Sequence, residues 1–60
     1  MDPDATLTEL RALVAKANRL GEIPIDDADR MCVLVEALDN WLMGGGFLPK
    51  SWGRHWMPKV

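Results

Sequence analysis

The residues best equipped for chemistry are few and lie far apart in this chain. His55 is the only histidine, and no serine, cysteine or carboxylate beside it in the sequence could complete a proton relay. Cys32 is the only cysteine, and it falls within a predicted helix, where we expect a structural thiol rather than a nucleophile. The sequence therefore predicts a protein that is not an enzyme and has no catalytic residues.

An acidic cluster and a glycine run are the other features with chemical potential. Asp26, Asp27 and Asp29 lack the glycine and distal glutamate of a calcium loop, and acids at the start of a helix act as caps. The glycines at 44–46 have no following lysine and serine or threonine in the spacing of a phosphate-binding loop. We therefore expect no metal site and no cofactor.

Length and composition predict a small folded domain with a thin core. The chain has 60 residues and is 48% hydrophobic, enough apolar side chain to fold. A domain of this size buries only about 60% of its unfolded surface, so dense packing or self-association must supplement the core. The acidic N-terminus does not resemble a signal peptide, and no run approaches the roughly 18 apolar residues of a membrane span. We expect a cytoplasmic protein without a membrane role.

The first predicted helix runs from about residue 4 to about residue 20. Its apolar residues recur at spacings of three and four: Leu7, Leu10, Leu13, Val14, Ala17 and Leu20. Two starts are possible, with either Asp2 ahead of a proline or Thr6 in a capping box, and we expect an onset between them near Asp4. Gly21 supplies the stop because glycine readily takes the left-handed conformation that ends helices.

The second predicted helix covers residues of about 27–43, with Asp26 as its cap and the glycines at 44–46 as its end. The short connector between the helices predicts an antiparallel hairpin. One apolar stripe is expected to face the first helix: Ala28, Met31, Val35, Leu38 and Leu42. Leu34 and Trp41 form a second ridge beside that stripe.

The second helix is thus more apolar than one neighbour requires. A two-helix hairpin alone would leave part of this surface in water, and exposed apolar surface usually marks a contact with a partner. A homodimer that forms a four-helix bundle would cover it. The C-terminal tail could cover the same ridge, and the two explanations are compatible.

The tail divides into two parts. Phe47, Leu48 and Trp52 follow the flexible glycines and are expected to pack back on the hairpin, which gives a domain of residues 1–52. Residues 53–60 are basic and aromatic, with Trp56 at their centre, and we expect them to be flexible.

Charge separates the tail from the body. Residues 1–43 carry nine acidic and four basic residues, a balance of minus five. The tail has no acidic residue and carries three positive charges: Lys50, Arg54 and Lys59. Such a tail either folds over the acidic body or contacts a partner.

Residues 34–42 followed by the run Gly-Gly-Phe-Leu-Pro-Lys-Ser-Trp resemble a pattern near the C-terminus of small uncharacterised proteins of actinobacterial phages, mycobacteriophages among them. The similarity covers roughly the second half of the chain, and GGFLPxxW is its distinctive part. It implies phage origin, and with it the host cytoplasm, but no activity and no catalytic residues. The family pattern stops soon after the tryptophan, so residues 54–60 depart from it.

Together these features predict a non-enzymatic protein–protein interaction module that forms a homodimer and can bind a host or viral protein. The candidate interface residues are the following: Leu34, Trp41, Phe47, Leu48, Trp52 and Trp56. The alternative is a nucleic-acid-binding accessory protein whose tail uses Lys50, Arg54 and Lys59. It ranks second because the second helix opens with aspartates that would repel phosphates and the net charge is minus two.

Overall fold

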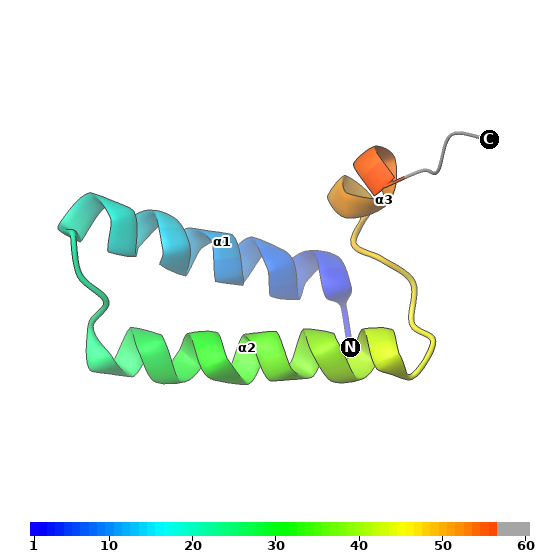
Figure 1. The fold of residues 1–60 in the computed structure, drawn as a ribbon, viewed down its shortest axis with the longest axis horizontal. Coiled ribbons are helices and arrows are strands. Elements are labelled where there is room, and N and C mark those ends of the chain that lie inside the picture. The colour runs from blue at the N-terminus through cyan, green and yellow to red at the C-terminus, as the bar shows by residue number, and fades with distance from the viewer. Residues whose placement is uncertain (57–60) are drawn as a thin grey trace.

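The computed structural model describes the backbone of residues 1–56 and the side chains of residues 1–53. It contains α1 (Pro3–Leu20), α2 (Ile25–Met43) and α3 (Lys50–Trp56). Figure 1 shows α1 and α2 side by side and antiparallel, with the short α3 beyond the end where α1 begins and α2 finishes. The predicted helical hairpin is confirmed, and the tail adds a third helix.

Helix α1 begins at the first of the two predicted starts. The Asp2 carboxylate accepts hydrogen bonds from the backbone N–H groups of Asp4 and Ala5 at 3.0 and 3.2 Å. Pro3 follows at the first helical position, where its missing N–H costs nothing. Gly21 ends the helix at φ 75° and donates its N–H to Ala17. The expected onset near Asp4 was one residue late because Asp2, not Thr6, is the cap.

Helix α2 begins earlier than predicted and without the predicted cap. Its flanking residue is Pro24, no side chain caps it, and Asp26 already lies in the first helical turn. The Pro24 carbonyl accepts the first helical hydrogen bond from Ala28 at 2.9 Å. The prediction of Asp26 as the cap is therefore wrong. Its negative charge in the first turn still interacts favourably with the positive end of the helix dipole. The end at Met43, before the glycines, is confirmed.

The tail reverses direction after α2 and forms α3. Gly45 has φ 90°, a conformation that favours glycine, and it lies in the turn between α2 and the extended run into α3. Trp52 and Gly53 donate their backbone N–H groups to the Pro49 carbonyl at 3.0 and 2.9 Å. Helix α3 continues to Trp56, so the predicted boundary at residue 53 falls inside a helix; residues 57–60 lie outside the described part.

The core lies where α1, α2 and the tail meet. Among the described side chains, the buried hydrophobic ones are Leu7, Leu34 and Leu38, each 4 to 5% exposed. Pro3 and Pro49 are also fully buried. Apart from these five residues, no described side chain is classed as buried. The core of the isolated chain is therefore as thin as its length predicts.

The apolar face of α2 is rotated from its predicted position. Leu34, predicted on the outer ridge, is 5% exposed, whereas Val35, predicted in the buried stripe, is 52% exposed. Successive residues of a helix point about 100° apart, so only one of these neighbours can face α1. Leu34, Leu38 and Trp41 follow one another at spacings of four and three, as the residues of the predicted stripe do. The spacing therefore fits both stripes, and the packing of α1 on α2 decides which of them is buried.

Two ion pairs join α1 to α2. The Arg30 guanidinium donates to both carboxylate oxygens of Glu9, from Nε to Oε2 at 2.6 Å and from Nη2 to Oε1 at 2.9 Å. The Lys16 ammonium lies 2.9 Å from Oδ2 of Asp27, close enough for an ion pair but not aligned for a hydrogen bond. Glu9 and Lys16 are seven residues apart and therefore share one side of α1. We call this the ion-paired side of the hairpin.

Candidate protein-binding groove

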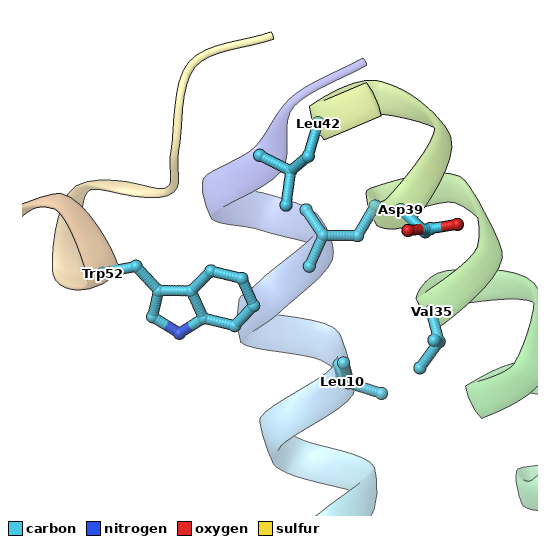
Figure 2. A pocket seen from close by; sticks show the side chains of 6 residues that line it. Leu10, Val35, Asp39, Leu42 and Trp52 are labelled. Atoms are coloured by element: carbon cyan, nitrogen blue, oxygen red, sulfur yellow. The ribbon is translucent and has the colours of Figure 1, made fainter. Parts of the chain in front are cut away.

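An apolar groove runs along the opposite side of the hairpin. Figure 2 shows its wall formed by side chains from all three helices. The lining residues are Leu10, Val35, Leu38, Asp39, Leu42 and Trp52. A hollow of about 230 Å³ remains between them. We call these residues the apolar groove.

A second, more open depression continues from the groove along α2. It shares Val35 and Asp39 with the groove and extends to Met31, Cys32 and Glu36. Cys32 is a free and exposed thiol here. The carboxylates of Glu36 and Asp39 make this edge acidic, and no ion pair neutralises either of them within residues 1–53. The surface is thus apolar at its centre and negatively charged along the α2 edge.

The tail forms one end of the groove through Trp52. Figure 2 shows the Trp52 indole directed from α3 toward the space between α1 and α2. Helix α3 starts at Lys50, so Trp52 lies in its first turn. Its side chain contributes to the groove wall together with Leu10 of α1 and Leu42 of α2. The predicted return of the tail to the hairpin is therefore confirmed for Trp52, which is half-buried in this position.

Trp41 and Phe47 form a separate aromatic contact. Their rings meet edge to face, with centroids 5.5 Å apart and planes at 88°. The indole Nε1–H of Trp41 also donates to the Phe47 carbonyl oxygen at 2.9 Å. Phe47 nevertheless remains 66% exposed, so only one face of its ring is covered. This contact fixes the turn after α2 and does not line the groove.

Asp4 holds the start of α3. Its Oδ1 atom accepts the backbone N–H of Lys50 at 2.6 Å, across 46 positions of sequence. The residue before Lys50 is a proline, which offers no side-chain oxygen, so α1 supplies the cap that the sequence around α3 lacks. Sequence reasoning missed this role because only tertiary structure brings the two residues together.

The structure separates the predicted interface residues into different environments. Leu34 is in the core, Leu48 is half-buried, Trp52 lines the groove, and Trp41 pairs with exposed Phe47. Trp56 and Arg54 lie in α3 with side chains outside the described part, and Lys59 lies outside it altogether. Lys50 is exposed. The groove instead uses Val35 and Leu42 of the predicted core stripe.

The surroundings of Glu9 shift the pKa of its carboxylate. The hydrogen bonds from Arg30 lower the pKa of Glu9; desolvation opposes this shift, and the positive charge of Arg30 adds to it. Both side chains are about half exposed, so the pair is a surface interaction that orients the helices rather than a catalytic one.

Other site types find no support in the described residues. No group of three or more histidine, cysteine, aspartate or glutamate side chains that could hold a metal ion occurs among them. None of the described helices combines the length and apolarity needed to cross a membrane. Comparison with protein-family models, curated proteins and solved structures finds nothing that matches this chain.

Proposed function

We propose that this chain is a small, non-enzymatic protein-interaction module that self-associates through its apolar groove. The observation that carries the proposal is the mismatch between a core of three well-buried hydrophobic residues and the large apolar side chains left in water. Val14 and Val35 are 40 and 52% exposed although each belongs to the apolar face of its helix. Exposed apolar side chains around an apolar groove favour a protein partner.

The size of the hollow favours a protein side chain over a small ligand. Pockets for small molecules usually enclose roughly 300–1,000 Å³ and cover most of the ligand. The hollow of about 230 Å³ beside Trp52 lies below that range. The depression of about 520 Å³ that continues from it along α2 is large enough but open, so it would not enclose a small ligand. A large apolar residue of a partner helix would fit it and act as an interface anchor.

A second copy is the partner that the charges and the fold support. Glu36 and Asp39 lie on the α2 edge of the groove and its continuation. Arg11 is exposed on α1, one residue after the groove residue Leu10. A two-fold copy that lays its α1 edge over the α2 edge of the first chain would bring these opposite charges together. Two such hairpins form a four-helix bundle and enlarge the thin core of each. A phage origin for the module is proposed from the resemblance of residues 34–52.

The test uses two valines that flank the buried Leu34. Val35 is 52% exposed and lines the groove, whereas Val33 is 56% exposed and does not. We expect sedimentation velocity to show a dimer for the native chain, a loss of at least tenfold in dimer affinity for Val35→Glu, and little change for Val33→Glu. The added charge is the same in both, so equal effects would show that the groove is not the interface.

The same measurements separate protein binding from nucleic-acid binding. A monomeric native chain that binds DNA or RNA with strong salt dependence would overturn the proposal in favour of the basic tail. We do not expect this result, because Trp52 packs against the hairpin and is thereby withdrawn from stacking on bases.

A further inference from the structure

Residues 46–53 cover one end of the apolar side of the hairpin. Leu7 and Val14 are seven positions apart and therefore share a face of α1, yet Leu7 is 5% exposed and Val14 is 40% exposed. The N-terminal end of α1 is the end that lies nearer to α3 (Figure 1). Leu7 belongs to this first part of α1, and Val14 lies about two turns farther along the helix. The tail is bonded to α1 at the Leu7 end, through Asp4, and this agrees with the deeper burial of Leu7.

We infer that residues 46–53 are a displaceable cover of the groove, held closed by the Asp4 carboxylate, and that their release enlarges the surface open to a second copy. This inference rests on the proposed self-association. We call residues 46–53 the C-terminal cover.

The first attachment of the C-terminal cover is the bond from the Lys50 N–H to Asp4. A hydrogen bond to a charged acceptor at a helix start satisfies an orphan N–H and also favours the helix dipole. Because α3 has no acidic residue in its own first turn, Asp4 is the described carboxylate that serves it. Loss of this carboxylate removes both the tether and the cap of α3.

The second attachment is the turn at Gly46. Gly46 donates its N–H to the Trp41 carbonyl at 2.8 Å, and its α-carbon lies against the Trp41 indole. Between this turn and Lys50, the Phe47 carbonyl accepts the hydrogen bond from the Trp41 indole, and no other hydrogen bond in the described structure joins residues 47–49 to α1 or α2. The C-terminal cover is therefore attached to the end of α2 through Gly46 and Phe47, to α1 through Lys50, and to the groove through Trp52. None of these contacts is part of the backbone hydrogen bonding of α1 or α2, so the cover can be released without breaking either long helix.

The closed cover and a second copy need the same residues. Trp52 shares the groove with Leu10, Leu38 and Leu42, which a partner helix would have to contact in order to use the full length of the hairpin. The hollow beneath Trp52 also shows that the C-terminal cover leaves part of this space unfilled. A partner residue can fill the hollow while the cover is closed, but a second copy can contact the full length of the hairpin only after Trp52 leaves. Closing the cover and this fuller docking are thus alternatives, and each must weaken the other equally by linkage.

The test compares two aspartates in first helical turns of the full-length chain. Asp4→Ala removes the tether, whereas Asp26→Ala removes a first-turn acid of α2 that makes no side-chain hydrogen bond in the described structure. We expect the Trp52 and Gly53 amides of Asp4→Ala to exchange with solvent at least tenfold faster, while the Leu34 and Leu38 amides keep their protection. We also expect Asp4→Ala to dimerise roughly tenfold more tightly, and Asp26→Ala to match the native chain.

A second variant acts on the other attachment, in case Asp4→Ala disturbs the start of α1. Gly46→Ala places a methyl group against the Trp41 indole, whereas Gly53→Ala adds one where no atom lies within 4 Å. Tighter dimers for Gly46→Ala but not for Gly53→Ala would support the inference. If the native chain dimerises but opening the cover leaves affinity unchanged or weakens it, the inference is wrong and the proposed function stands. If no variant dimerises, both are wrong.

Discussion

The Trp41 indole lies against the α-carbon of Gly46 so closely that a Cβ atom at position 46 would overlap the ring. The same indole donates its N–H to the Phe47 carbonyl at 2.9 Å, so its position is constrained from both sides. The turn that sends the tail back to the hairpin therefore depends on the absence of a side chain at residue 46. Backbone freedom alone does not explain this glycine, because its φ is not positive.

Gly46→Ala should lower the free energy of unfolding by about 1–3 kcal/mol, the usual cost of forcing extra volume into a packed contact. Gly53→Ala should be neutral or stabilise by up to about 1 kcal/mol, because it improves helix propensity in α3 without a close neighbour. Urea denaturation monitored by circular dichroism measures both. Equal stability of the two variants would show that the Trp41 contact is not tight in solution.

Leu34→Ala and Val35→Ala should differ sharply although the residues are adjacent. Leu34 is 5% exposed, and its truncation should cost about 2–5 kcal/mol of stability. Val35 is 52% exposed, and its truncation should change the stability of the monomer by less than about 1 kcal/mol. The comparison requires denaturation at concentrations well below the dimer dissociation constant, because self-association adds stability. A larger loss of stability for Val35→Ala than for Leu34→Ala would show that the predicted stripe, with Val35 buried, is correct.

The Glu9–Arg30 pair should make stability depend on pH. The hydrogen bonds from Arg30 keep the pKa of Glu9 below its ordinary value, so the pair contributes fully above the unfolded pKa of about 4.3. That contribution is lost as the pH falls through the lower pKa of the folded state. The stability difference between the native chain and Glu9→Gln should therefore shrink from pH 7 to pH 3.

Urea midpoints at intervals of pH measure this difference for Glu9→Gln. Glu22→Gln is the control, because Glu22 is exposed and forms no ion pair among the described residues. The expected effect is small, since both partners of the Glu9–Arg30 pair are about half exposed. A difference that stays constant across this range would show that the pair does not form in solution.

Asp2→Ala should lower stability by about 0.5–2 kcal/mol through loss of the α1 cap. Asp2→Asn should retain most of that stability, because the asparagine oxygen can still accept from the N–H groups of residues 4 and 5. Thermal unfolding of the two variants beside the native chain gives the ranking. If both lose the same amount, the charge of Asp2 rather than its hydrogen bonds accounts for the effect.

The sequence by itself determined the features that depend on local chemistry. Gly21 ends α1 in the left-handed conformation that glycine adopts readily. After α2, Gly44 keeps a negative φ and Gly45 takes the positive one. The helical hairpin follows from apolar residues at helical spacing and a short connector. The start of α2 was predicted wrongly: Asp26 was expected as the cap, but α2 begins at Ile25, directly after Pro24, and no side chain caps it.

Only the tertiary structure decided which apolar residues are buried and what the tail contacts. Leu34 and Val35 fit overlapping helical stripes, and the choice between them depends on how α1 packs on α2, with the ion pairs on one side and the groove on the other. The cap that Asp4 provides for α3 joins residues 46 positions apart and leaves no trace in local sequence. Such contacts arise when separate elements meet, so a pattern that reads neighbours along the chain cannot predict them.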